Sequence, residues 1–226
     1  MKQKVSDYIA DRLAQEGISQ VFTVTGGGAM HLNDSLGHHP GLSCLYQHHE
    51  QAAAMAAEAY ARVDNRMAAV CVTSGPGATN AITGALCAWM DSIPMLVLSG
   101  QVRYDTTVRH SGLKIRTMGV QEYDITPSVE PMTKYAVMVT DPLTIRYHLE
   151  RAIYLAKTGR PGPCWLDLPL NVQSAVVETD DLKAYDPSED AKELPAPVSE
   201  ETVKQILEKL KLASQPLIFA GHGIRL

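Results

Sequence analysis

The sequence predicts an α/β fold, namely a doubly wound parallel sheet with helices on both faces. Nearly continuous apolar runs, typical of strands buried inside a parallel sheet, occur at residues 68–73, 95–100 and 164–168. Helical segments lie between such runs, and polar or glycine-rich turns lead into them. Because the strand–turn–helix unit repeats several times, a parallel sheet with its functional loops at the carboxyl ends of the strands is the simplest architecture.

The individual elements follow from local patterns. Helical spacing of apolar residues predicts a helix over 5–16 that ends at Gly17. Further helices are predicted at 30–36, 50–62, 80–90 and 142–157, the last with Leu143, Leu149, Ile153 and Ala156 facing inward. Shorter strands are predicted at 21–24 and 42–46.

Glu50 lies where the strand at 42–46 leads into one of the strongest helix-forming runs of the chain. The run to Arg62 is rich in alanine and contains neither Gly nor Pro. Its small side chains would let a neighbouring backbone or ring approach closely. On local pattern alone, Glu50 is better explained as an acidic residue favoured by the helix dipole than as a functional carboxylate above the sheet.

Two glycine-rich turns follow predicted strands, at 25–30 and 74–80. A dinucleotide fingerprint in the first would need glycine at the position of His31, and no P-loop Lys-Ser/Thr follows. A tight turn that lets something flat approach the backbone is therefore favoured over a phosphate site. The long connection at 102–128 carries several basic residues, and it reads either as a loop that meets an anionic substrate or as a solvated flap.

Composition excludes several functional classes. The net charge of −5 argues against nucleic-acid binding, and no apolar run is long enough for a membrane span. The N-terminus lacks the apolar core of a signal peptide, and the four cysteines are far apart, so we expect reduced thiols in a cytoplasmic protein. Five histidines between 31 and 49 fit no metal-ligand spacing, so no metal site is predicted in this chain.

The sequence predicts one main domain over residues 1–179 and a polar linker over 180–198. Residues 199–226 read as the beginning of a truncated central domain, with an amphipathic helix after Ser199 and a strand at 216–223. One helix and one strand cannot bury a core of their own, so we expect the chain to be a fragment.

Several motifs, in order, resemble a known family. They are His49-Glu50-Gln51 with the alanine-rich helix to Arg62, the segment from Thr73 to Asn80, Asp91-Ser92-Ile93-Pro94, Ser99-Gly100-Gln101, Gln121-Glu122-x-Asp124, and Gly159-Arg160-Pro161-Gly162-Pro163. This combination resembles the N-terminal pyrimidine-binding domain of thiamine-diphosphate-dependent enzymes, closest to the acetolactate synthase large-subunit group. The resemblance covers about residues 1–177.

The resemblance implies roles for particular residues. Glu50 would be the catalytic glutamate that hydrogen-bonds the cofactor's pyrimidine ring and so activates the aminopyrimidine. Pro76 and Asn80 would join Glu50 in binding the cofactor, while Gly27, Gly28 and Gln121 would face the substrate. The diphosphate and Mg²⁺ would be held by a separate C-terminal domain, because its Gly-Asp-Gly segment does not occur here.

The implied activity is that of a lyase or carboligase (a transferase) acting on a 2-oxo acid, with thiamine diphosphate and Mg²⁺ as cofactors. FAD remains open as a further cofactor of full-length relatives. The implied assembly is a homodimer or homotetramer through the pyrimidine domain, and we expect the fragment alone to be inactive. A thiamine-diphosphate-dependent oxidase, a cyclic-dione hydrolase and a non-catalytic dimerisation module of the same fold are the alternatives.

Overall fold

The computed structural model describes residues 1–191 and 196–225. Its centre is a six-stranded sheet in which every neighbouring pair is parallel, as the apolar runs predicted. From one edge to the other, the strands are β3 (Ser43–Tyr46), β2 (Gln20–Thr23), β4 (Ala68–Val72), β5 (Met95–Gln101), β7 (Pro163–Pro169) and β6 (Tyr135–Met138). The chain runs outward from β2 to β3 and then returns to β4 on the other side of β2. The carboxyl ends of β2 and β4 therefore form the point where the winding direction reverses, which is where α/β sheets bind ligands.

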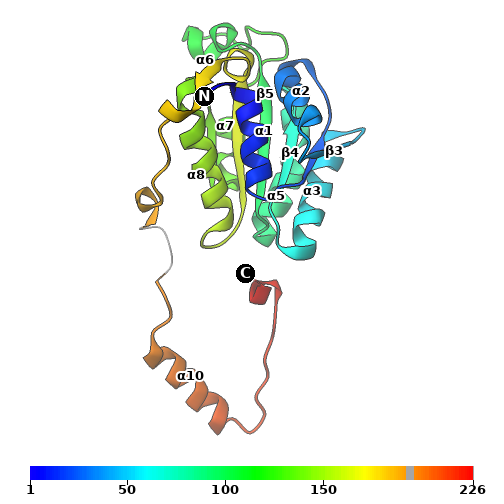
Figure 1. The fold of residues 1–226 in the computed structure, drawn as a ribbon. Coiled ribbons are helices and arrows are strands. Elements are labelled where there is room, and N and C mark those ends of the chain that lie inside the picture. The colour runs from blue at the N-terminus through cyan, green and yellow to red at the C-terminus, as the bar shows by residue number, and fades with distance from the viewer. Residues whose placement is uncertain (192–195, 226) are drawn as a thin grey trace.

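Helices cover both faces of the sheet (Figure 1). One face carries α1 (Val5–Gln15), α2 (Met30–His38), α8 (Ile145–Lys157) and α9 (Leu170–Gln173). The opposite face carries α3 (Glu50–Asp64), α5 (Ile82–Asp91) and α7 (Thr126–Val129). The doubly wound fold predicted from the sequence is confirmed.

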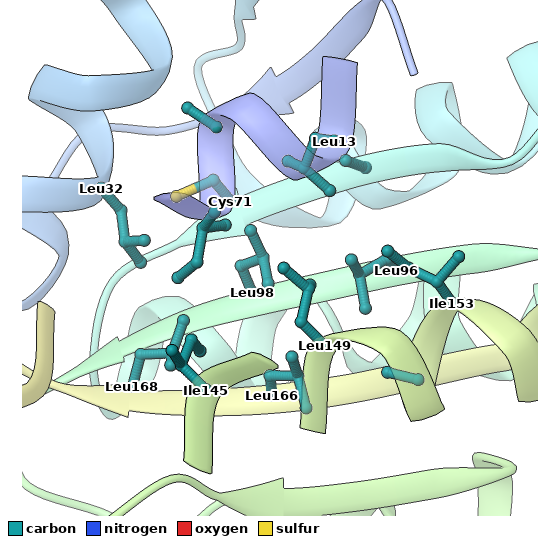
Figure 2. Close-up of a cluster of buried hydrophobic side chains, with 14 of the residues drawn as sticks. Leu13, Leu32, Cys71, Leu96, Leu98, Ile145, Leu149, Ile153, Leu166 and Leu168 are labelled. Atoms are coloured by element: carbon teal, nitrogen blue, oxygen red, sulfur yellow. The ribbon is translucent and has the colours of Figure 1, made fainter. Parts of the chain in front are cut away.

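Alternate residues of the central strands supply the two cores. Figure 2 shows Leu96 and Leu98 of β5 and Leu166 of β7 among the side chains of α1 and α8, and all three are fully buried. The intervening residues Val97 and Trp165 face the core beneath α3 and α5. A strand whose side chains are buried on both faces has no polar alternation, which explains the continuous apolar runs in the sequence.

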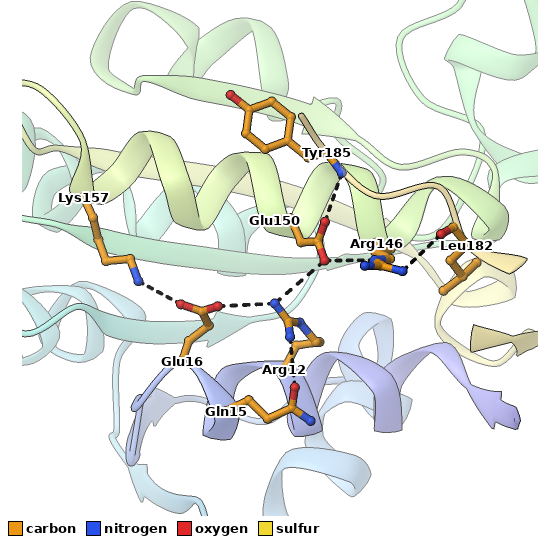
Figure 3. Close-up of polar contacts among 8 residues, drawn as sticks. All are labelled: Arg12, Gln15, Glu16, Arg146, Glu150, Lys157, Leu182 and Tyr185. Atoms are coloured by element: carbon orange, nitrogen blue, oxygen red, sulfur yellow. Dashed lines mark hydrogen bonds and ion pairs between the residues drawn. The ribbon is translucent and has the colours of Figure 1, made fainter. Parts of the chain in front are cut away.

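Polar contacts fasten α8 to α1 and to the segment after the main domain (Figure 3). Glu150 of α8 lies 3.8 Å from the Arg12 guanidinium of α1, and its other oxygen accepts a hydrogen bond from the Tyr185 backbone. Arg151 makes two bonds of 2.8 Å to the Asp190 carboxylate, which also accepts from the Tyr185 hydroxyl. Residues 182–190, which the sequence places in the linker, thus include side chains buried against α8.

Short elements complete the fold. The strands β1 (Lys2–Lys4) and β8 (Val176–Glu178) form a separate antiparallel pair. The remaining short helical elements of the main domain are η1 (Gly27–Ala29), α4 (Pro76–Asn80), η2 (Tyr104–Thr106), α6 (Val108–Ser111), η3 (Glu130–Met132), η4 (Pro142–Thr144) and η5 (Thr179–Asp181). None of the helices in the described part of the chain combines the length and hydropathy that crossing a bilayer requires.

The helix predicted over 80–90 is α5, and a further short helix, α4, forms within the turn predicted at 74–80. Two local predictions are wrong. Leu143 is exposed because it belongs to the η4 turn before α8 and not to the buried stripe of the helix. Residues 216–223 form no strand, since no neighbouring strand is there to pair with them.

After the main domain come η6 (Pro187–Glu189), α10 (Glu200–Leu212) and η8 (His222–Arg225). The predicted cap of α10 is confirmed, because the Ser199 side chain accepts a hydrogen bond from the Thr202 backbone. Every residue of α10 is exposed, including its apolar stripe of Val203, Ile206, Leu207 and Leu210. Residues 192–195 of the predicted linker and Leu226 lie outside the described residues.

Candidate active site

The predicted site residues gather at the carboxyl edge of the sheet, around the ends of β2, β3 and β4. The turn after β2 and the turn after β4 are joined directly, because the backbone N–H of Gly28 donates to the Thr73 hydroxyl over 3.0 Å. This contact ties together the two loops that flank the reversal point of the sheet.

Glu50 is the first residue of α3 and is half-buried. The residue before it, His49, caps the helix, since its Nδ1 accepts a hydrogen bond of 3.1 Å from the Gln51 backbone. The positive end of the helix dipole thus lies beside the Glu50 carboxylate and favours its negative charge.

Asn80, at the end of α4, donates from Nδ2 to Glu50 Oε2 over 2.8 Å. This hydrogen bond joins two residues that are thirty positions apart in the chain, and both were predicted as cofactor ligands. Within residues 1–191 and 196–225, Oε1 of Glu50 has no hydrogen-bond partner. One carboxylate oxygen is therefore held by the protein and the other is available to a ligand.

The turn after β4 is shaped by close contacts. Gly75 has a φ of 57°, and a Cβ built on it would lie 2.0 Å from the Gln121 carbonyl oxygen. A Cβ on Gly77 would meet the Thr73 side chain at 2.6 Å and Glu50 Oε1 at 3.4 Å. Pro76, between them, begins α4 and is exposed. These glycines let the turn lie flat beside the carboxylate.

The residues predicted to face the substrate lie on the same edge, in different surroundings. Gly28 packs tightly, since a Cβ there would meet the Ser74 hydroxyl at 2.7 Å. Gly27 is exposed, its φ is not in the positive range, and a Cβ on it would meet nothing within 4 Å. Gln121 has an exposed side chain and a left-handed backbone with φ of 55°. Gly27 and Gln121 thus present surface that the chain's own packing does not require.

A buried polar network lies beneath these loops, and the sequence did not predict it. The Asp167 carboxylate of β7 accepts from the Ser99 hydroxyl over 2.6 Å and from Gln101 Nε2 over 3.1 Å. Ser99 in turn accepts from the Trp165 indole N–H over 2.8 Å. Burial raises the pKa of Asp167 to about 7, while the hydrogen bonds from Ser99 and Gln101 act in the opposite direction. The available signal was an acidic residue inside an otherwise apolar strand.

The histidines and cysteines make no metal centre in the described part of the chain, where no group of three or more His, Cys, Asp or Glu could hold an ion. His39 lies 3.0 Å from Asp11, and His38 lies 3.2 Å from Asp34. All four cysteines are free thiols; Cys71 and Cys164 are buried, and Cys44 and Cys87 are partly buried.

The family follows from comparison with known proteins. A family model described as "Thiamine pyrophosphate enzyme, N-terminal TPP binding domain" matches residues 3–122, which contain the first four motifs and the first two residues, Gln121 and Glu122, of the fifth. The chain belongs to this family. The matched region includes Glu50, Asn80 and both glycine-rich turns, so every predicted site residue lies within it.

Curated relatives agree with the resemblance to acetolactate synthases. The chain is 36% identical over 224 residues to the acetolactate synthase large subunit of Lactococcus lactis, which covers 97% of this chain and 36% of that protein. It is 33% identical over 225 residues to the acetolactate synthase isozyme 3 large subunit of Escherichia coli, covering 96% and 37% respectively. A mitochondrial acetolactate synthase of Schizosaccharomyces pombe is 35% identical over 222 residues, covering 95% and 32%. The chain thus spans about a third of the length of these relatives.

Proposed function

We propose that this chain supplies the aminopyrimidine-binding half of the active site of a thiamine-diphosphate-dependent carboligase or lyase that acts on a 2-oxo acid, as an acetolactate synthase does. The observation that carries the proposal is the Glu50 carboxylate, with one oxygen bound by Asn80 and the other available at the reversal point of the sheet. Family membership and the similarity to acetolactate synthases support the cofactor and the substrate class.

The polar and apolar groups of the site fit the pyrimidine end of the cofactor. A ring nitrogen that carries a proton needs one carboxylate oxygen as its acceptor, and Oε1 of Glu50 offers it. Gly75 and Gly77 let the turn after β4 pack against Gln121 and Thr73, which leaves Pro76 exposed between them as an apolar contact for a flat ring. An apolar surface and a single oriented acceptor are what a planar heteroaromatic ring requires.

Thiamine diphosphate, when bound, supplies a thiazolium carbon that becomes a nucleophile once its C2 proton is removed. Glu50 would share a proton with the pyrimidine ring nitrogen, so that the neighbouring exocyclic nitrogen could lose one of its own protons and then accept the C2 proton. Asn80 keeps the carboxylate in one orientation by its bond to Oε2. Placing one oriented carboxylate at hydrogen-bonding distance is the protein's share of this acid–base step.

The other parts of the site follow from the same assignment. Gly27, Gly28 and Gln121 line the side on which the 2-oxo acid is bound. In keeping with the resemblance to this family, we assign the diphosphate and Mg²⁺ to a separate domain.

We further propose a homodimer or homotetramer, in which exposed apolar side chains on the outer surfaces of α3 and α5 meet another subunit. Met55, Leu86, Trp89 and Met90 are such side chains. The buried alanines of α3 are not part of this surface, because they pack on α5 within the chain.

The test is proton/deuterium exchange at C2 of bound thiamine diphosphate in the full-length gene product. Glu50→Gln should slow this exchange by on the order of a hundredfold or more, because the variant cannot hold the proton at the ring nitrogen. The control is Glu208→Gln, which removes the same charge from the exposed helix α10. Exchange at the wild-type rate in Glu50→Gln would exclude the role proposed for Glu50.

A further inference from the structure

The buried network around Asp167 reaches the surface loop that carries Gln121. Gln101, at the end of β5, is 1% exposed and uses its amide nitrogen twice. Its Nε2 donates to Asp167 Oδ2 over 3.1 Å and to the Tyr123 carbonyl over 2.8 Å. Its Oε1 accepts from the Val102 backbone N–H over 3.0 Å. Every polar atom of this side chain is therefore engaged, which leaves it one orientation.

The hydrogen bonds of this network all run toward Asp167. The Trp165 indole can only donate, so Ser99 accepts from it, and the Ser99 hydroxyl donates to Asp167 Oδ1. Gln101 Nε2 can only donate as well, so Asp167 Oδ2 is an acceptor. Both oxygens of Asp167 therefore accept, as an ionised carboxylate does. Deep burial makes such a set of bonds stronger, and it makes the loss of one partner more costly.

The loop needs this support because its backbone is strained. Gln121 has a φ of 55°, a region that costs a non-glycine residue free energy unless its surroundings impose it. On one side, the Gln121 carbonyl lies against Gly75. On the other, the Glu122 carboxylate accepts from the backbone of Val108 over 2.7 Å and of Met118 over 2.8 Å. Beneath the loop, the Tyr123 carbonyl is held by Gln101.

We propose that Asp167, acting through Gln101, is a positioning residue that fixes the loop at 119–124 against the turn at Gly75 and thereby sets the place of Gln121 at the active-site edge. Both side chains are buried, Asp167 at 0% and Gln101 at 1% exposed. The carboxylate orients the Gln101 amide, and the amide holds the Tyr123 carbonyl two residues from Gln121. The consequence for catalysis rests on the proposed function, whereas the consequence for loop order does not.

Loop order is tested by hydrogen–deuterium exchange of the full-length gene product at pH 8, where Asp167 is mainly ionised. In Asp167→Asn, the two acceptor oxygens of the carboxylate are replaced by one amide oxygen and one NH₂ group. Either the Ser99 hydroxyl or the Gln101 amide then faces a donor in place of an acceptor. In Gln101→Met, the length is kept and all hydrogen bonds are lost. In both variants, amides at 119–124 should exchange at least about tenfold faster, the ratio expected for losing one buried hydrogen bond.

The matched control is Thr23→Val, which removes another buried hydrogen bond of the same sheet, from Thr23 Oγ1 to the Cys71 carbonyl. Its exchange at 119–124 should match that of the wild type. Unchanged exchange at 119–124 in folded Gln101→Met overturns the proposal, as does an equal rise in Thr23→Val. If Asp167→Asn fails to fold, Gln101→Met alone decides the outcome.

A kinetic measurement separates positioning from general damage. Gln101→Met should raise the KM for the 2-oxo acid severalfold more than it lowers kcat, and the Kd for thiamine diphosphate should stay at the wild-type value. If Gln101→Met lowers kcat and the affinity for the cofactor but leaves the KM unchanged, Gln101 does not position the loop on the substrate side. A wild-type protein that turns over no 2-oxo acid overturns the proposed function, but the exchange result still decides whether Asp167 and Gln101 hold the loop.

Discussion

Gly75 shows how closely single residues constrain the edge of the sheet. Its φ of 57° and the Gln121 carbonyl at 2.0 Å from a built Cβ leave no place for a side chain. Gly75→Ala should therefore lower the free energy of unfolding by about 3 kcal/mol, from backbone strain and from the displaced carbonyl together. Urea unfolding followed by circular dichroism measures this difference.

Gly27→Ala is the matched control, because a Cβ there meets no atom within 4 Å. Its free energy of unfolding should stay within about 0.5 kcal/mol of the wild type. Equal losses in both variants would mean that the contact between Gly75 and Gln121 is not what requires glycine.

The two carboxylates of greatest interest differ in how readily the sequence reveals them. Glu50 was predicted from the ordered motifs that resemble a known family, because its local pattern favours an ordinary acidic residue in the first turn of a helix. Asp167 was missed because its partners Ser99 and Gln101 are 68 and 66 positions away. Only the pairing of β5 with β7 brings them together. Local patterns identify the start of an element, but they do not identify contacts between strands.

At the scale of elements, the alanine-rich helix α3 packs closely on α5. A Cβ on Gly84 of α5 would lie 2.4 Å from the Ala54 Cβ and 2.8 Å from the Met55 backbone nitrogen. The close approach expected from the small side chains is thus made by α5. Gly84→Ala should lower the free energy of unfolding by about 1–3 kcal/mol, since the two helices must move apart. Urea unfolding again provides the measurement.

Gly37→Ala in α2 should change the free energy of unfolding in the opposite direction. The nearest atom to a built Cβ there is the tip of the Tyr46 side chain at 3.3 Å, which can move aside. Alanine also favours the helix, so this variant should be neutral or more stable by up to about 1 kcal/mol. A Gly84→Ala variant as stable as Gly37→Ala would contradict the packing described for α3 and α5.

The strands that are buried on both faces were all predicted, whereas some of the more exposed strands, though not β3, were missed. The runs that form β4, β5 and β7 are apolar throughout, whereas β6 is a four-residue edge strand with three half-buried residues. The antiparallel pair β1 and β8 joins residues about 175 positions apart and has three residues in each strand. Such short pairs depend on tertiary placement, because their local sequence carries too little pattern.

Asp167 in β7 makes the stability of the fold depend on pH. Burial raises the folded-state pKa of Asp167 to about 7, above the usual value of about 3.9 in an unfolded chain. Between about pH 4 and pH 7 the folded protein therefore binds the extra proton, and its stability falls as the pH rises through this range. Asp167→Asn should remove this part of the slope, as measured by urea unfolding at several pH values. A wild-type slope retained in the variant would assign the effect to other groups.

At the scale of the whole molecule, one sheet edge collects every residue assigned to the site. The loops after β2, β3, β4 and β5 lie there because parallel strands all end on the same side. The order of the motifs along the chain was enough to predict this gathering. The hydrogen bond between Glu50 and Asn80, and the placement of Gln121 beside Gly75, required the three-dimensional fold.

The distribution of ligand groups over the molecule predicts how the 226-residue chain behaves on its own. It offers Glu50 and Asn80 to a pyrimidine ring, while the division of the site proposed above leaves the diphosphate and its Mg²⁺ to a separate domain. In residues 1–226 alone, the charged end of thiamine diphosphate would therefore stay in water. Calorimetry with this chain, thiamine diphosphate and Mg²⁺ should give a Kd weaker than about 100 μM, which corresponds to a binding free energy of less than about 5.5 kcal/mol in magnitude. Glu50→Gln in the same chain should weaken even this binding. A micromolar Kd for residues 1–226 would show that the diphosphate is bound by groups within this chain, and it would overturn the division of the site between two domains.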